Sequence, residues 1–257
     1  MDERPPRVIV TRPAQEAGRW VDGLRQAGFD AVTLPLIVIE PLEELSALQQ
    51  AQHAIDDFAA LMFVSAAAVT HFFTQGVVLR PGQRCWSTGP GTARALRQAG
   101  VPEAAIDTPP EAAARFDSES LWACVRTQVG AGTRVMIVRG GDTAGRATGR
   151  DWLARSIESA GGVVDAVVAY RRLAPVLDEA QRRMAVDGAS GCDLWLFSSS
   201  EAVTNLVEAM PGQSWAAARA LATHERIAEA ARNAGFGHVR CCSPDMATLM
   251  ASIESFE

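Results

Sequence analysis

Two short stretches of the chain resemble each other: RVIVTRP at residues 7–13 and RVMIVRG at residues 134–140. Each begins with an apolar run and leads into an amphipathic segment that ends at a glycine, Gly28 in the first case and Gly161 in the second. A glycine in this place is typical of the residue that terminates an α-helix. An apolar strand followed by a helix is the unit of parallel β/α folds. The pattern predicts two related β/α segments.

The similarity continues along the rest of the chain at an offset of about 130 residues. LMFVSAAAV at 61–69 corresponds to LWLFSSSEAV at 194–203, and GPGTARALRQAG at 89–100 corresponds to HERIAEAARNAG at 224–235. The apolar runs lack polar–apolar alternation, as expected for strands covered by helices on both faces. We therefore predict an α/β fold with two doubly wound parallel-sheet domains from an internal duplication, each half having enough strands for one sheet.

Two extended, β-branched segments bounded by proline occupy equivalent places in the repeat, at 37–41 and 167–174. We interpret them as interdomain linker strands. If both cross between the domains, domain 1 is discontinuous and consists of 1–36 plus 175–257, while 42–166 forms domain 2. Two domains in series are the alternative. A two-stranded linker predicts a hinge, about which the domains reorient.

Composition excludes several classes of function. The chain of 257 residues carries 24 Lys+Arg against 30 Asp+Glu, a net charge of −6, which argues against nucleic acid as a partner. All 24 cations are arginine, so chemistry that needs a lysine is excluded, including Schiff bases and Walker-A phosphate loops. The five cysteines and four histidines lack metal-ligand spacing, which predicts no metal site and a reduced, cytosolic protein. No apolar run is long enough to span a membrane, and no secretory signal is recognisable.

Polar residues gather at the predicted carboxyl ends of the strands, where parallel sheets bind ligands. Hydroxyls, guanidinium groups and helix N-termini are hydrogen-bond donors, so this edge favours an anionic small molecule. For any one hydroxyl, a helix N-cap without a binding role is the alternative. The candidate substrate-binding residues are Thr11, Arg12, Ser65, Gly89, Thr92, Arg139, Gly140, Ser198, Ser199 and Ser200.

Two glycine-rich loops match known phosphate motifs poorly. GPGTAR at 89–94 lacks the third glycine of a dinucleotide fingerprint and does not follow the first strand of its unit. RGGDTAGRATGR at 139–150 is not followed by the Lys-Ser/Thr of a phosphate loop. For this second loop we expect a mobile anion-binding segment, with an ordinary flexible loop as the alternative. No Ser-His-Asp or Cys-His arrangement is evident.

Tyr170 is the exception in this donor-rich set, and it is the only tyrosine in the chain. It lies on the second predicted linker strand, where it is expected to face the gap between the domains. A phenol there can act as a general acid, which makes Tyr170 the candidate catalytic residue. Packing of its ring along the strand is the alternative.

The ordered set of motifs VTRP, LPLI, FVSAAAV, STGPGTARAL, VAYRR, LFSSSEAV and HERIAEAA resembles the uroporphyrinogen-III synthase family over nearly the whole chain. No single motif is specific, but the set is. The resemblance implies two α/β domains joined by a two-stranded linker, with the active site in the cleft between them. It also implies a cofactor-free, monomeric, cytosolic enzyme of tetrapyrrole (haem) synthesis.

The resemblance further implies that the substrate is hydroxymethylbilane, a linear tetrapyrrole with many carboxylates. This substrate is cyclised to uroporphyrinogen III with loss of water and inversion of ring D. A two-lobed, non-catalytic protein that binds a small polyanion is the alternative. Transient contact with the preceding enzyme, hydroxymethylbilane synthase, is left open.

Individual residues are carried over by motif. Tyr170 matches the tyrosine proposed to assist departure of the substrate's terminal hydroxyl. Many members have threonine where this chain has Ile227, so one hydroxyl donor is missing. The nearest replacements are His224, Glu225 and Arg226, or backbone N–H groups. Hydroxyl positions that contact substrate in the family match Ser65, Thr92 and Ser198, and basic positions match Arg12 and Arg139.

Overall fold

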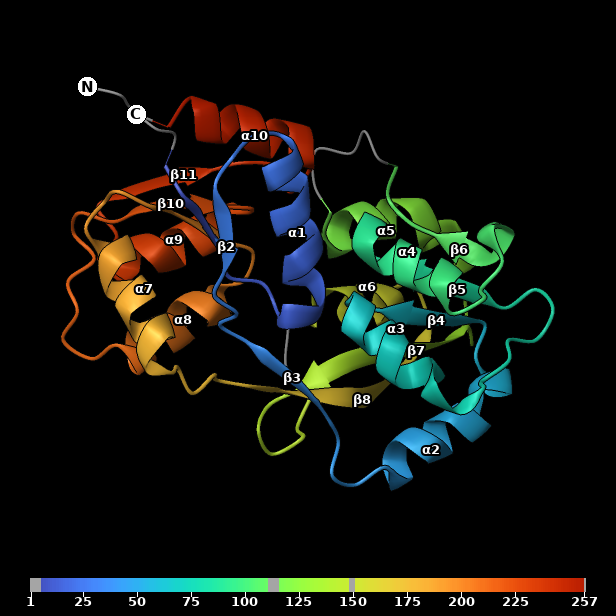
Figure 1. Cartoon of the computed structure of the whole chain (residues 1–257). Helices are drawn as coiled ribbons and strands as arrows, with labels where there is room; N and C mark the ends of the chain where they lie inside the picture. The colour runs from blue at the N-terminus through green and yellow to red at the C-terminus, as the bar shows by residue number, and fades with distance from the viewer. Residues whose placement is uncertain (1–5, 111–115, 148–150, 257) are drawn as a thin grey trace. The chain divides into compact units, whose positions relative to one another are not determined.

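The computed structural model describes residues 6–110, 116–147 and 151–256. The chain divides into two compact units: unit 1 consists of Met1–Val38 and Leu173–Glu257, and unit 2 consists of Ile39–Arg172. Each unit contains one sheet (Figure 1). Among the described residues, no helix is both long enough and apolar enough to cross a membrane.

Unit 1 is built on a five-stranded sheet in the order β11-β10-β9-β1-β2, and all of its neighbouring strands pair in parallel. Its elements are β1 (Val8–Val10), α1 (Ala14–Gln26), β2 (Ala31–Thr33), α7 (Glu179–Ala189), β9 (Leu194–Phe197), α8 (Ser200–Ala209), β10 (Arg219–Ala222), α9 (Glu225–Asn233), β11 (His238–Cys241) and α10 (Met246–Glu254).

Helices cover both faces of this sheet. On one face, α1 and α10 bury Leu24 and Leu249 against β1 and β9. On the other face, α7 lies so close that a Cβ on Gly188 would come within 2.8 Å of the Ile9 side chain and 2.9 Å of Trp195. Coverage on both faces explains why the strands are apolar without alternation.

Unit 2 is built on a six-stranded sheet in the order β3-β8-β7-β4-β5-β6. The pairs β8–β7, β7–β4, β4–β5 and β5–β6 are parallel. Its elements are β3 (Val38–Pro41), α2 (Ser46–His53), η1 (Ile55–Asp57), β4 (Ala60–Phe63), α3 (Ala66–Phe72), η2 (Phe73–Gln75), β5 (Arg84–Ser87), α4 (Pro90–Gln98), η3 (Glu103–Ala105), β6 (Ile106–Asp107), α5 (Ser118–Val125), η4 (Arg126–Gln128), β7 (Arg134–Gly141), α6 (Trp152–Ser159) and β8 (Val163–Leu173).

The sheet of unit 2 is also covered on both faces. Phe63 and Val138 point into a cluster with buried side chains of α2, α3 and α4, such as Phe72. Met62 and Ile137 point the other way, into a cluster with α5 and α6. The predicted α/β class, with two doubly wound parallel sheets, is confirmed.

The two sheets have the same strand order. At the offset of the sequence repeat, β2-β1-β9-β10-β11 of unit 1 correspond to β8-β7-β4-β5-β6 of unit 2. This agrees with duplication, but each half of the repeat does not form its own sheet. The first half supplies β1-α1-β2 to unit 1 and β4 to β6 to unit 2, and the second half does the reverse.

The unit boundaries differ from those drawn on the sequence. The segments 37–41 and 167–174 were expected to be linkers, yet the units divide after Val38 and after Arg172. Strand β8 continues through Tyr170 and pairs with β7 as far as Gly141↔Arg171, beside β3 on its other edge. Most of both segments therefore belongs to the sheet of unit 2. An extended, β-branched sequence is compatible both with an interdomain linker and with a strand that completes a sheet, so the pattern does not distinguish them.

Candidate functional site

The predicted site residues follow the strands at which the order of each sheet reverses. In unit 1 this switch point lies between β1 and β9, and in unit 2 it lies between β7 and β4. Doubly wound sheets bind ligands beyond the carboxyl ends of such strands. Thr11 and Ser198 follow β1 and β9, and Ser65 and Arg139 lie at the matching ends in unit 2. Each unit therefore presents one group of candidates.

Tyr170 reaches the unit 2 group because β8 contains a bulge. Arg139 pairs with Val168 and Gly140 pairs with Tyr170, so Ala169 is an extra residue in β8. Val164 packs against the α5/α6 side of the sheet, and regular alternation would send residue 170 to that side too. The extra residue reverses the alternation, and Tyr170 joins the cluster beside α3.

In the described part of the chain, Ser65, His71 and Gly140 are neighbours of the Tyr170 phenol. Its hydroxyl shares a hydrogen bond of 3.0 Å with Ser65 Oγ. The His71 ring stacks on the Tyr170 ring, with centroids 5.7 Å apart and an interplanar angle of 29°. Gly140 leaves room for the ring, since a Cβ there would lie 2.7 Å from Tyr170 Cζ. Tyr170 is 3% exposed and belongs to the core cluster of unit 2.

Ser65 has two hydrogen bonds through its hydroxyl. Its residue is the N-cap of α3, and Oγ accepts a hydrogen bond of 3.1 Å from the backbone N–H of Ala68. This contact uses one lone pair of the oxygen and leaves the hydroxyl proton available for Tyr170. The predicted substrate contact is thus, in this structure, also the partner of the predicted acid.

Arg139 lies in the buried part of β7 and is 8% exposed. Its Nη1 donates to Asp151 Oδ1 over 3.2 Å, and the Asp151 side chain is 58% exposed. Strand β7 therefore positions the guanidinium group, which pairs with a solvent-exposed carboxylate. A carboxylate ligand can take the place of such an exposed partner without leaving a buried charge alone.

The glycine-rich loop after β7 has a defined turn in its described part. The Asp142 carboxylate accepts from the backbone N–H groups of Ala144 and Arg146, each over 2.9 Å. These hydrogen bonds, that from Arg146 first, lower the pKa of Asp142. Because the two N–H groups already have an anionic partner, they do not support the anion-binding interpretation. Residues 148–150 of the predicted loop lie outside the described part of the chain.

Gly89 and Thr92 lie beyond β5, one strand away from the switch point of unit 2. Gly89 is the N-cap of α4 in extended backbone, and a Cβ on it would come within 3.1 Å of Phe116 Cβ. Thr92 lies in the first turn of α4 and is buried, with 6% exposure. The structure places both residues beside the N-terminus of a helix, as the sequence indicated.

Two of the predicted hydroxyls in unit 1 serve the fold. Thr11 Oγ1 donates 2.7 Å to the carbonyl oxygen of Leu196, which ties the end of β1 to β9. Ser199 is the N-cap of α8 and accepts from the backbone N–H of Glu201. Ser198 is half-buried, and the buried Oγ of Ser200 has no hydrogen-bond partner among the described residues. Ser198 and Ser200 are therefore the hydroxyls that remain for a ligand.

The side chain of Arg12, which precedes α1, is held by two residues of that helix. Its Nη1 donates to Glu16 Oε2 over 2.9 Å, and its guanidinium carbon lies 4.3 Å from the centroid of a Trp20 ring. Burial lowers the pKa of Arg12, although the ion pair with Glu16 opposes the shift. The residue is oriented by α1, and Glu16 competes with any anionic ligand for it.

The family threonine position, Ile227, is buried with 3% exposure. His224 caps α9 instead of a hydroxyl residue, since its Nδ1 accepts from the backbone N–H of Arg226 over 3.1 Å. Glu225 pairs with Arg232 over 2.6 Å. The side chains of His224 and Glu225, two of the replacements considered from the sequence, are thus engaged in holding α9.

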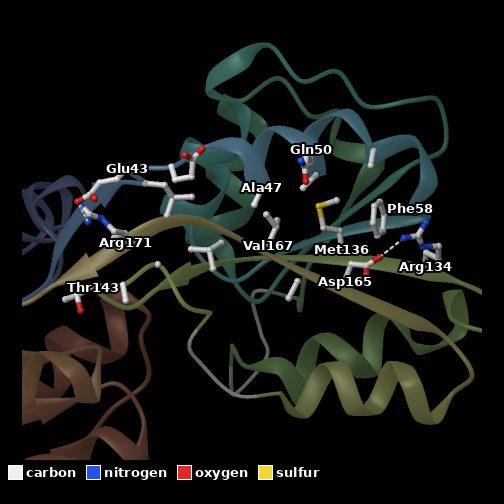
Figure 2. Close-up of a pocket in the computed structure, with 18 residues that line it drawn as sticks. Glu43, Ala47, Gln50, Phe58, Arg134, Met136, Thr143, Asp165, Val167 and Arg171 are labelled. Atoms are coloured by element: carbon white, nitrogen blue, oxygen red, sulfur yellow. Dashed lines mark hydrogen bonds and ion pairs between the residues drawn. The ribbon is translucent and has the colours of Figure 1, made fainter.

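Sequence reasoning missed a pocket of about 720 Å³ in unit 2, between α2 and the strands β7 and β8 (Figure 2). Met136 and Val167 form an apolar floor, and the ion pair of Arg134 with Asp165, at 2.7 Å, lies at one end. None of the predicted site residues lines it. The available signal was the weak apolar face of α2, on which Leu48 is the buried residue.

Metal coordination finds no support here, because the described residues contain no group of three or more potential metal-binding side chains. The chemistry of the two groups is therefore that of hydroxyls, guanidinium groups and one phenol.

The model of the family described as uroporphyrinogen-III synthase HemD matches residues 18–251. The chain belongs to the uroporphyrinogen-III synthase family. The match covers most of both units, and the family inferred from the ordered motifs is confirmed. Members of this family are lyases of tetrapyrrole biosynthesis, so the prediction of an enzyme is confirmed with it.

Individual relatives agree. The chain is 26% identical over 210 residues to the uroporphyrinogen-III synthase of Chlorobaculum parvum, covering 79% of this chain and 78% of the relative. It is 29% identical over 221 residues to that of Synechococcus elongatus, covering 82% and 78%. Solved uroporphyrinogen-III synthase structures from Thermus thermophilus (a mutant) and Helicobacter pylori share the fold. Each has a TM-score of 0.58, with 16% identity over 97% of both chains and 13% identity over 98% and 100%, respectively.

Proposed function

We propose that this chain converts hydroxymethylbilane into uroporphyrinogen III, with loss of water and inversion of ring D. The observation that carries the proposal is the family match over residues 18–251, which includes all the candidate residues except Thr11 and Arg12. The donor-rich edge of each sheet fits a substrate with many carboxylates. A two-lobed binding protein without catalysis, the alternative from the sequence, has no comparison in its favour.

Tyr170 is proposed as the general acid for the first step. The phenol gives its proton to the terminal hydroxyl of the substrate, and the C–O bond breaks. Water departs, and the rest of the substrate is left as an azafulvene cation. The terminal carbon of ring A then forms the bond to the substituted carbon of ring D. In the spiro intermediate so formed, the bond between that carbon and the bridge to ring C breaks, and the bridge carbon then bonds to the unsubstituted α-carbon of ring D, which inverts ring D and closes the macrocycle. The proton lost when the final pyrrole regains aromaticity returns to the phenolate, so the phenol is restored.

Ser65 is proposed to stabilise the phenolate formed in that step. Its Oγ accepts from Ala68 N–H and lies 3.0 Å from the Tyr170 oxygen, so the Ser65 hydroxyl proton can be donated to a phenolate there. Hydrogen bonds to a charged oxygen are stronger than those to a neutral one, and this bond therefore favours proton release. The role proposed for Ser65 is support of the acid in addition to any contact with substrate.

The remaining candidates are proposed to bind the substrate or to shape its site. In unit 2 these are Arg139, Thr92 and the helix start at Gly89, while Gly140 makes room for the acid. In unit 1 they are Arg12, Ser198 and Ser200. Thr11 and Ser199 are proposed to act through the backbone they hold. The unaided bilane closes to the wrong isomer, so a site that imposes its folded conformation supplies much of the catalysis.

Further properties belong to the proposal. We expect a monomeric cytoplasmic enzyme without cofactor, and transient contact with hydroxymethylbilane synthase is compatible with this activity. The chain passes between the units at two places, near Val38 and near Arg172, which supports the expectation of a hinge there.

The direct test supplies the pure protein with enzymatically generated hydroxymethylbilane and resolves the oxidised products into type I and type III isomers. We expect type III to dominate, whereas heat-denatured protein leaves the type I isomer. Type I alone with the native protein contradicts the proposal. Binding of the bilane without any turnover would support the non-catalytic alternative.

A further inference from the structure

His71 has a half-buried imidazole ring that stacks on the ring of Tyr170. The centroids lie 5.7 Å apart, at an interplanar angle of 29°. Among the described residues, neither ring nitrogen of His71 has a hydrogen-bond partner. Thr74 bonds only the backbone carbonyl of His71. A half-buried imidazole that stacks on Tyr170 and has no hydrogen bond to a described residue is placed to act on that ring.

Helix α3 carries both of the contacts that fix Tyr170. Ser65 caps the helix and reaches the phenol oxygen, and His71 in its last turn reaches the ring. The helix is anchored to the core through Ala68, Val69 and Phe72, which are fully buried. The Ser65 hydroxyl and the His71 imidazole are therefore held by the same helix. This helix fixes both the oxygen and the ring plane of Tyr170.

The third wall comes from the neighbouring strand. A Cβ on Gly140 would lie 2.8 Å from Cε2 and 2.9 Å from the hydroxyl oxygen of Tyr170. The bulge at Ala169 turns the side chain toward this gap. The ring thus passes close to the backbone of β7 while α3 holds its face and its hydroxyl.

We propose that His71 is a positioning residue for Tyr170, which acts by holding the plane of the phenol so that its hydroxyl stays on Ser65 and in register with the substrate. The inference rests on the catalytic role proposed for Tyr170. A general acid works only within hydrogen-bond reach of its target, and misplacement by about 1 Å can cost 10²-fold in rate.

The charge state of His71 is consistent with a ring that positions Tyr170 through stacking alone. Burial lowers the pKa of His71, so the imidazole is neutral near pH 7. A neutral flat ring offers an offset-stacked contact without placing a positive charge against the phenol. Leucine at this position loses the flat face, whereas phenylalanine keeps it and loses only the nitrogens.

The test uses the full chain with His71→Leu and His71→Phe, and it exploits the single tyrosine. An isotope label at the ζ carbon of tyrosine gives one NMR signal, which reports Tyr170 alone. We expect His71→Leu to shift or broaden this signal and to lower kcat about 10-fold, with KM changed less than about 2-fold. His71→Phe should restore the signal and most of kcat. Thermal melting of both variants shows that they are folded.

His53→Leu is the matched control, because His53 is exposed on α2 of the same unit and bonds only Gln49 O within its own helix. It should leave the Tyr170 signal and kcat unchanged. An unchanged signal in His71→Leu overturns the inference. Equal loss of kcat in both His71 variants with an unchanged signal also overturns it, since His71 would then act through its nitrogens. A changed signal with full activity supports the contact and instead refutes the catalytic role of Tyr170.

Discussion

Units 1 and 2 share one strand order, and they differ at the ends of two corresponding strands. In unit 1, β1 and β2 are three residues each, and the chain leaves the sheet at Thr11. In unit 2, β7 has eight residues and β8 has eleven, with a bulge near their carboxyl ends. The prolonged pair carries Arg139, Gly140 and Tyr170 beyond the length that the shorter copy attains. If Tyr170 has the role proposed above, the extended and bulged strand pair is what gives unit 2 its catalytic group.

The helices before β9 and β4 differ as well. In unit 1, α7 lies flush on the sheet, with Gly188 against Ile9 and Trp195. In unit 2, the shorter α2 stands off the strands and a pocket of about 720 Å³ remains below it. Close packing of a helix on a sheet requires a small residue at the contact. One copy has therefore retained a tight core at this place and the other has not.

The largest expected effect on kcat comes from removing the Tyr170 hydroxyl, which has no counterpart in unit 1. Tyr170→Phe keeps the ring and should lower kcat about 10²-fold, the lower end for a positioned general acid, while the product stays type III. Stability should fall by about 1 kcal/mol, because Ser65 keeps its bond to Ala68 N–H. Steady-state kinetics, isomer analysis and thermal melting measure these three quantities. Full activity would make Tyr170 a packing residue, and an equally large loss of stability would make it a structural one.

Gly140→Ala tests the space that the bulge uses. The new methyl group would lie 2.7 Å from Tyr170 Cζ, so the ring must move, and kcat should fall about 10-fold or more. The matched control is Gly18→Ala in α1, where a Cβ meets nothing within 4 Å. It should leave kcat unchanged and raise the free energy of unfolding by about 0.5–1 kcal/mol. Wild-type kinetics for Gly140→Ala would show that the phenol position is not critical.

Arg139→Ala addresses anchoring of substrate carboxylates at the end of β7. Because such an anchor persists from ground state to transition state, KM should rise about 10-fold while kcat changes little. Arg134→Ala is the control at the other end of the same strand, where the arginine pairs with Asp165. It should leave KM unaffected. An unchanged KM for Arg139→Ala removes this residue from the site.

Thr11→Val probes the hydroxyl that unit 1 uses for its own fold. Loss of the bond to Leu196 O should lower the free energy of unfolding by about 1 kcal/mol, with kcat and KM unchanged. Denaturant unfolding and steady-state kinetics measure the two effects separately. A large rise in KM without loss of stability would return Thr11 to the binding site and erase this difference between the units.

The strands and helices were predictable, because apolar runs without alternation and glycines such as Gly28 and Gly161 mark local structure, whereas the strand order was not predicted. The placement of Tyr170 against Ser65 was not, since it depends on a bulge at Ala169 that no local residue signals. The structural use of the Thr11 hydroxyl also escaped prediction, because its partner lies 185 residues away in the chain. Local patterns report elements, whereas the partners of polar side chains are decided by the tertiary fold.

The exchange of repeat halves between the units has a consequence for biosynthesis. Unit 2 is one contiguous segment, Ile39–Arg172, and it can complete its sheet as soon as that segment has been synthesised. Strands β1 and β2 emerge first, yet β1 must wait for β9, with Val8 paired to Leu194. During that interval the apolar faces of β1 and α1 lack their partners. The oldest part of the nascent chain is thus among the last to be buried, and a chaperone has most to protect there.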